Sequence, residues 1–221
     1  MRLPFVLLLA VAAVFSFTPA AQAQKPPKQP PGKQDVTIKA SANPVTFSVP
    51  LVISGSVKGV QAATPVTLQR RTPTSTTFST VATAATNDKG DYTFTTRPKA
   101  NSVYRVAAST NPVVNSPEML VRVAPLVGFS VNDSSARAGQ RITFRGTVRP
   151  AHDGRSVQIQ RKRADGSWGT LVRTTLRDAG SVFSSYRRVL TVRATGTYRV
   201  RIIGHSDHAI GTSRERTVTV R

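Results

Sequence analysis

The chain has 221 residues, of which 39% are hydrophobic and 6% aromatic, and it contains no cysteine. The absence of cysteine excludes a disulfide framework, a thiolate metal site and a lipid-modified cysteine anchor. The formal net charge of +21 predicts either a basic surface that keeps the protein soluble or a polyanionic partner, such as a cell-envelope polymer, an acidic polysaccharide or nucleic acid.

The first part of the sequence predicts export. Residues 1–23 combine Arg2, an apolar run over residues 5–17 and an Ala-x-Ala site at residues 21–23, which is typical of a cleaved signal peptide. The apolar run is short for a membrane span, and no other segment approaches spanning length, so we expect no span in the mature chain. Residues 24–34 are rich in proline and lysine, which favours an extended basic tether. We therefore expect a secreted or cell-surface protein.

From residue 35 onward the chain contains one pattern twice. A Gly-x-Val segment at residues 55–57 is followed by Val-x-Leu-Gln-Arg at residues 66–70, and related segments stand 91 residues later, at residues 146–148 and 157–161. Apolar and polar residues alternate in these segments, which predicts strands with one buried face. Each copy has about seven such strands with turn signals between them, which favours a β-sandwich over a closed barrel.

The two copies meet at a short junction, Ala124-Pro125. We therefore predict an all-β chain of two tandem sandwiches, residues 35–124 and 125–221. Tyr104 and Tyr198 stand at matching places near the end of each copy. A tyrosine at about this place in immunoglobulin-like domains bonds back to the backbone at a corner, so we expect the same of these two.

Both halves resemble the bacterial immunoglobulin-like and fibronectin type III-like modules of exported proteins. Besides the two motifs above, the resemblance rests on Tyr-Arg-Val at residues 104–106 and 198–200 and on Asp-x-Gly at residues 88–90 and 178–180. It covers residues 36–221, and the pattern Asp-x-Gly-x-Tyr is also similar to carboxypeptidase regulatory-like modules. The resemblance implies immunoglobulin-like sandwiches that act as spacers, adhesins or binding accessories.

No set of residues predicts catalysis, a metal or a cofactor. The sequence has no Gly-x-Ser-x-Gly elbow and no phosphate-binding loop, so we expect no enzyme. The segment His-Ser-Asp-His at residues 205–208 would need a further metal ligand, for which His152 is the remaining histidine, and we predict a solvated loop instead. Asp88 and Asp91 favour a hairpin turn over a calcium site.

Strand parity predicts a candidate binding surface. If Val157 and Ile159 point inward, their neighbours in sequence point outward, and the same holds for the strands around Val200 and Phe144. The outward residues that we expect on one sheet are Gln158, Gln160, Lys162, Arg199 and Arg201, and those that we expect along one strand of the other sheet are Arg141, Arg145 and Arg149. The first copy has Gln69, Arg71 and Arg105 at positions equivalent to some of them.

These features predict an exported, non-enzymatic binding or adhesion protein. Its basic strand faces would contact anionic cell-envelope polymers or another exported protein. Outward aromatic residues do not accompany the basic ones, so we expect no specific nucleic-acid recognition. Two alternatives stay open: the arginines can serve only to keep sheet edges apart, and the chain can be a structural spacer or assembly subunit that pairs with other chains by strand addition.

Overall fold

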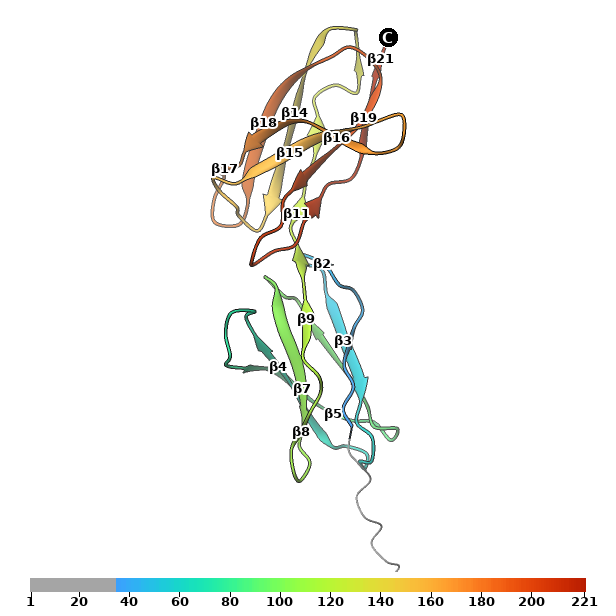
Figure 1. Ribbon diagram of the computed structural model, residues 1–221, viewed down its shortest axis with the longest axis vertical. Coiled ribbons are helices and arrows are strands. Elements are labelled where there is room, and N and C mark those ends of the chain that lie inside the picture. Colours follow the sequence, from blue (N-terminus) through green and yellow to red (C-terminus); the bar gives the residue numbers. More distant parts are fainter. Residues whose placement is uncertain (1–34) are drawn as a thin grey trace, which may run out of the picture. The chain divides into compact units, whose positions relative to one another are not determined.

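The computed structural model describes residues 35–221, and these residues form strands and turns without a helix (Figure 1). The prediction of an all-β protein is confirmed for this part of the chain. The predicted signal peptide, residues 1–23, and the predicted tether, residues 24–34, lie outside the described residues. We call residues 35–124 the N-terminal half and residues 125–221 the C-terminal half.

The N-terminal half contains three sheets. Their strand orders are β1-β3-β6, β10-β2 and β5-β4-β7-β8, and β9 also pairs with β7. The pair of β2 and β10 is parallel, and the other pairs are antiparallel. The strands are β1 (Lys39–Ala40), β2 (Val45–Thr46), β3 (Leu51–Ser56), β4 (Pro65–Arg71), β5 (Ser79–Ala85), β6 (Asp91–Thr96), β7 (Ser102–Ala108), β8 (Val114–Asn115), β9 (Met119–Val121) and β10 (Val123–Ala124).

The C-terminal half contains two sheets. One has the order β11-β14-β18-β17, with β12 also on β14, and the other has the order β13-β21-β19-β15-β16, with β20 also on β19. The strands are β11 (Leu126–Val127), β12 (Ser130–Val131), β13 (Ser135–Ala136), β14 (Gln140–Arg149), β15 (Ser156–Lys162), β16 (Trp168–Thr175), β17 (Arg177–Asp178), β18 (Ser184–Val192), β19 (Gly196–Ile202), β20 (Gly211–Thr212) and β21 (Arg216–Val220).

Each half has its own cluster of buried hydrophobic residues. The N-terminal cluster runs from Val36 to Val123, and the C-terminal cluster runs from Val127 to Val218. The alternation of apolar and polar residues in the sequence is consistent with these clusters. On β3, for example, Leu51 and Ile53 are buried while Val52 between them is exposed. Burial of these apolar side chains is the main force that holds sheets face to face.

The two halves share their strand register as well as their motifs. β4 pairs with β5 and β7, as β15 pairs with β16 and β19. A register irregularity falls between Leu68 and Gln69 in one half and between Ile159 and Gln160 in the other. The two halves therefore share even a local irregularity in strand pairing. Irregularities of this kind bend and twist a strand.

The glycine of each Gly-x-Val motif permits a close approach between strands. A Cβ atom on Gly55 would lie 2.0 Å from the Thr37 carbonyl oxygen, and one on Gly146 would lie 2.0 Å from the Gly128 carbonyl oxygen. A tyrosine hydroxyl reaches the same oxygen in both halves, since Tyr92 donates to Thr37 and Tyr186 donates to Gly128. Only glycine leaves room for this arrangement.

The expectation for Tyr104 and Tyr198 was wrong in this respect. The Tyr104 hydroxyl is buried and has no hydrogen-bond partner, and the hydroxyls that bond to the backbone are those of Tyr92 and Tyr186. Burial raises the pKa of both bonded tyrosines above the ordinary value, which keeps their hydroxyls protonated as donors.

Candidate functional site

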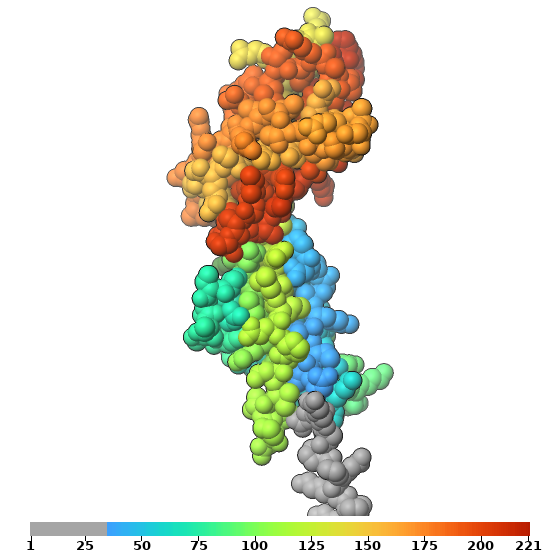
Figure 2. Space-filling model, in the orientation of Figure 1, coloured from blue at the N-terminus to red at the C-terminus, as the bar shows by residue number. Residues whose placement is uncertain are grey.

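The expected surface on β15 and β19 is a packed layer. Gln158 and Gln160 were expected to be exposed, but their side chains are buried, with 6% and 4% of their area accessible. Neighbouring long side chains on the same face cover them. The guanidinium of Arg199 donates from Nε to Gln160 Oε1 at 2.8 Å and lies 4.1 Å from the centre of the Trp168 ring. The orange residues of β15 and β16 lie at the front of the C-terminal half in Figure 2.

Two other members of this layer are also engaged. Lys162 lies 3.8 Å from Glu215 in an ion pair, and Arg199 and Arg201 are each only half exposed. Burial lowers the pKa of Arg199, and the charge of Arg201 lowers it further. An ion that is desolvated and already hydrogen-bonded is a poor docking site for an external polymer.

The N-terminal half contains the same layer. Arg105 donates to Gln69 at 2.8 Å and lies 4.0 Å from the centre of the Phe78 ring. Arg71 is paired with Glu118 at 2.6 Å. The arginine, glutamine and aromatic residue of this layer therefore recur as a packing unit. Sequence parity placed these side chains on the correct face but did not show that an aromatic neighbour covers them.

The arginines expected on β14 are exposed. Arg141, Arg145 and Arg149 all lie on the outer face of the sheet, as predicted. The structure adds two arginines that were not predicted from the sequence. Arg187 on β18 stands directly opposite Arg145, and Arg177 on β17 stands opposite Ser185. The alternation of β18 around buried Ser184 and Tyr186 was the signal that would have placed Arg187 outside. We call these five residues the arginine face.

The arginine face has no acidic partner among residues 35–221, because none of its members takes part in an ion pair. An open hollow of about 550 Å³ lies at its centre, over Gly146, and is lined by Arg145, Arg177 and Arg187. Ser130, Thr147, Ser185 and Tyr186 complete its lining. The arrangement offers guanidinium and hydroxyl donors to an anionic group.

The corresponding hollow in the N-terminal half is not basic. It measures about 330 Å³, lies over Gly55, and is lined by Ser54, Asp91, Thr93 and Lys39 among others. Ser54 pairs with Thr93 as Arg145 pairs with Arg187. The two halves therefore carry the same hollow, with two arginines in one at the places of a serine and a threonine in the other.

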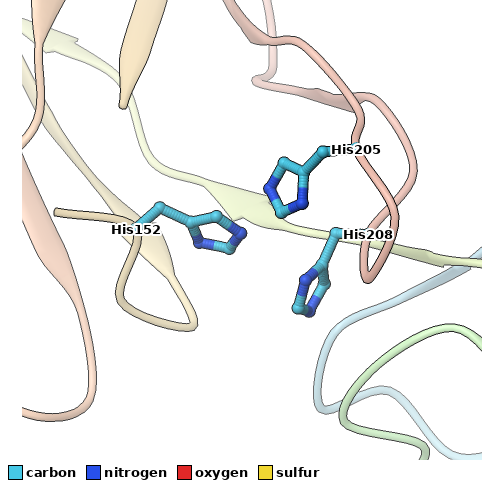
Figure 3. A group of neighbouring side chains, drawn as sticks. All are labelled: His152, His205 and His208. Carbon is cyan, nitrogen blue, oxygen red and sulfur yellow. The ribbon is translucent and has the colours of Figure 1, made fainter. Parts of the chain in front are cut away.

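All three histidines of the chain meet at one place (Figure 3). His152 lies in the loop between β14 and β15, and His205 and His208 lie in the loop between β19 and β20. One ring nitrogen from each lies within 4.8 Å of the other two. The expectation of a solvated loop was wrong, because His152 and His208 are buried, at 6% and 4% exposure. The cluster forms because the loop between β19 and β20 lies beside His152 in space, and the sequence does not show this proximity.

Backbone carbonyls hold two of the rings. His152 Nδ1 lies 2.7 Å from the Pro150 carbonyl oxygen, and His208 Nε2 lies 2.9 Å from the Lys99 carbonyl oxygen. The Asp207 carboxylate contacts His205 Nδ1, and its second oxygen lies 3.3 Å from His208 Nδ1. Burial lowers the pKa of His152, so this ring favours its neutral form.

Comparisons with known proteins do not name the site. No family model matches the chain, and no curated protein matches it. Among the described residues there is also no helix with the length and apolar character needed to cross a membrane.

Proposed function

We propose that this chain is an exported, non-enzymatic protein of two tandem immunoglobulin-like sandwiches, and that the arginine face of its C-terminal half binds anionic polymers. The proposal draws on the export signal and the resemblance in the sequence, and on the arginine face. Of the residues expected from the sequence, it keeps the arginines of β14, leaves out the layer around Gln158, and adds Arg177 on β17 and Arg187 on β18.

The cross-strand pair of Arg145 and Arg187 carries the proposal. Like charges directly opposite each other on a sheet destabilise it, by about 0.2–1 kcal/mol. A sandwich that needed only solubility would be expected to separate these charges or pair them with an acid. An anion bound between the two guanidiniums neutralises the repulsion and accepts charge-assisted hydrogen bonds. Phosphate, sulfate and carboxylate groups of envelope polymers all have this chemistry.

A double variant tests the arginine face with the chain's own alternative residues. Arg145→Ser with Arg187→Thr installs the residues found at the matching positions Ser54 and Thr93. Titration with inorganic polyphosphate and with a sulfated polysaccharide, at low and high salt, should show a loss of affinity of roughly 10–100-fold at low salt. Binding by the unmodified chain should fall steeply as salt rises.

The matched control removes two arginines elsewhere. Arg173→Ser with Arg214→Thr causes the same loss of net charge at exposed positions outside the arginine face. We expect this control to lower polymer affinity by no more than about threefold, since only distant charge is lost. Equal losses in the two double variants would show that total charge, rather than this face, attracts the polymer, and would refute the proposal.

A second candidate function is strand addition by a partner chain. Among the described residues, β5 and β16 each pair with a single neighbour, so each is an edge strand, of 7 and 8 residues respectively. Edges of this length offer unpaired backbone groups to an incoming strand. Binding of a partner in this way should be nearly independent of salt, which separates it from polymer binding.

A further inference from the structure

We propose that His152, His205 and His208 form a binding site for a divalent transition metal ion of the zinc type. The site is separate from the arginine face and does not depend on the function proposed for it.

Hydrogen bonds fix which nitrogens are available to a metal. A carbonyl oxygen accepts only from an N–H group, so His152 carries its hydrogen on Nδ1, beside Pro150, and His208 carries it on Nε2, beside Lys99. The lone pairs of the neutral rings are then on His152 Nε2 and His208 Nδ1. Both atoms are buried and have no hydrogen-bond partner. Histidines that bind metals typically hold their second nitrogen in this way, on a carbonyl or a carboxylate.

Asp207 supports the same assignment from the other side. Its carboxylate contacts His205 Nδ1, and both ring nitrogens of His205 are buried without a hydrogen-bond partner. Its second oxygen stands 3.3 Å from His208 Nδ1, which carries a lone pair when the ring is neutral. A lone pair facing a carboxylate is repulsive unless a cation or a proton lies between them. A metal ion bound there would be attracted by the carboxylate and would accept a lone pair from each of the three rings.

The size of the cluster fits one ion after a small contraction. Zinc binds imidazole nitrogen at about 2.0–2.1 Å in tetrahedral geometry, which places neighbouring nitrogens about 3.4 Å apart. Here one ring nitrogen of each histidine lies within 4.8 Å of one ring nitrogen of each of the other two. The rings are inclined to each other by 59°, 72° and 67° rather than stacked, so their edges can turn toward a shared centre (Figure 3). The fourth position would be filled by Asp207 or by water.

The donor set selects the class of metal. Three imidazoles suit Zn²⁺, Cu²⁺ and Ni²⁺, whereas Ca²⁺ and Mg²⁺ prefer a shell of oxygen ligands. Asp207 is the one carboxylate that contacts the histidines among the described residues. The chain has no cysteine to offer as a competing soft ligand. The expected order of affinity therefore puts zinc and copper far above magnesium and calcium.

A hollow borders two of the three histidines, and metal binding would stiffen the loop that carries them. An open hollow of about 630 Å³ is lined by both His205 and His208. The loop that carries them is already tied at three backbone points, since Asn101 donates to Asp207, His205 to His208 and Ala209 to Val123. A metal bridge from this loop to His152 would join it to the loop between β14 and β15.

The N-terminal half lacks this cluster. Counted from the matched glycines Gly55 and Gly146, His152 corresponds to Gln61. Ser116 and Ser213 occupy equivalent places, because each hydroxyl accepts the backbone N–H of β7 or β19, and counting back from them puts Asn111 opposite His208. The fold therefore does not need histidine at these positions.

Metal titration of the untagged chain tests the site. The protein must be made without a polyhistidine tag, so that its only imidazoles are these three. Isothermal titration with Zn²⁺ should show one saturable site per chain, and Mg²⁺ and Ca²⁺ should show none. Zinc at about 100 times its Kd should raise the melting temperature by roughly 5–10 °C, and EDTA should reverse the rise. In nuclear magnetic resonance spectra, zinc should shift the ring signals of all three histidines.

Variants locate the binding. His205→Gln and His152→Gln each remove one ligand and should lower zinc affinity by more than the roughly 10–100-fold typical of losing an outer-shell partner. Asp207→Asn, at an exposed position, should cause a smaller loss, and Asp88→Asn, an exposed acid remote in sequence, should cause none. Polyphosphate affinity should be unchanged in His205→Gln, which separates this site from the arginine face.

Two results would overturn the proposal. One is a chain that takes up no Zn²⁺, Cu²⁺ or Ni²⁺ at a saturable site. The other is undiminished zinc affinity in His205→Gln, which would place the ion elsewhere. If His152→Gln does not fold, the ring signals of the unmodified chain still decide the question, because zinc that leaves them unmoved is not bound by histidine.

Discussion

The two halves of the chain share the residues that hold their strands together. They differ in the residues that form the two proposed binding sites. Both have a glycine under a tyrosine hydroxyl, and both have an arginine between a glutamine and an aromatic ring. Only the C-terminal half has arginines around the hollow and a histidine cluster. The comparison indicates that the shared residues maintain the fold, and that the residues of the two proposed sites stand at positions where the fold tolerates variation.

The glycines should give the largest effects. Gly146→Ala forces a Cβ atom to within 2.0 Å of a backbone oxygen and 2.5 Å of the Tyr186 hydroxyl, and Gly55→Ala does the same beside Tyr92. We expect each change to cost about 3 kcal/mol or more of unfolding free energy, because strands must move apart and a hydrogen bond is lost. Denaturant unfolding measures this cost. A neutral result in either half would break the equivalence of the two motifs.

The covered arginines should come next. Arg199→Ala leaves the buried Gln160 side chain without its donor, and Arg105→Ala removes the donor to the half-buried Gln69 side chain. We expect a loss of about 1–3 kcal/mol in each case, compared with less than about 0.5 kcal/mol for the exposed Arg173→Ala. Urea melts of the three variants test this order. If Arg199→Ala proved as mild as the Arg173 control, the layer would be an ordinary surface.

The tyrosine hydroxyls should have a smaller effect. Tyr186→Phe and Tyr92→Phe keep the ring in the core but remove the donor to Gly128 and Thr37 respectively. We expect each variant to lose about 1 kcal/mol of unfolding free energy. Tyr104→Phe removes a buried hydroxyl that has no partner, so it should be neutral or stabilising. Thermal melts in which Tyr104→Phe proved the most harmful would contradict this assignment.

The arginine face should affect stability least. Arg145→Ser with Arg187→Thr removes a repulsive cross-strand pair at exposed positions. We expect the unfolding free energy to stay within about 0.5 kcal/mol of the unmodified value, or to rise slightly. Calorimetry of this variant shows whether the two arginines support the fold. A large destabilisation would mean that they belong to the shared scaffold after all.

The sequence predicted features that depend on period and spacing. The alternation around Ile142 and Val157 placed buried and outward positions correctly, and the outward direction of Arg141, Arg145 and Arg149 followed from it. These features are local, since a strand's parity fixes the direction of every second side chain.

The sequence could not show which outward residues remain exposed. Gln158 is covered by side chains whose reach depends on neighbouring strands, and Arg187 joins the arginine face only through its register with β14. The histidine cluster depends on two loops, around His152 and residues 205–208, that are more than 50 residues apart in the chain. Which side chains cover a residue, and which distant loops meet, are decided by the tertiary structure. No local sequence pattern shows either.

The most direct test moves the arginine pair from the C-terminal hollow to the N-terminal hollow. Ser54→Arg with Thr93→Arg, made in the Arg145→Ser/Arg187→Thr background, moves the arginine pair to the N-terminal hollow while the net charge returns to its original value. Polyphosphate affinity at low salt should rise by at least about threefold over the background variant. Affinity that stays at the background level would contradict the claim that a facing arginine pair over this glycine hollow binds the anion.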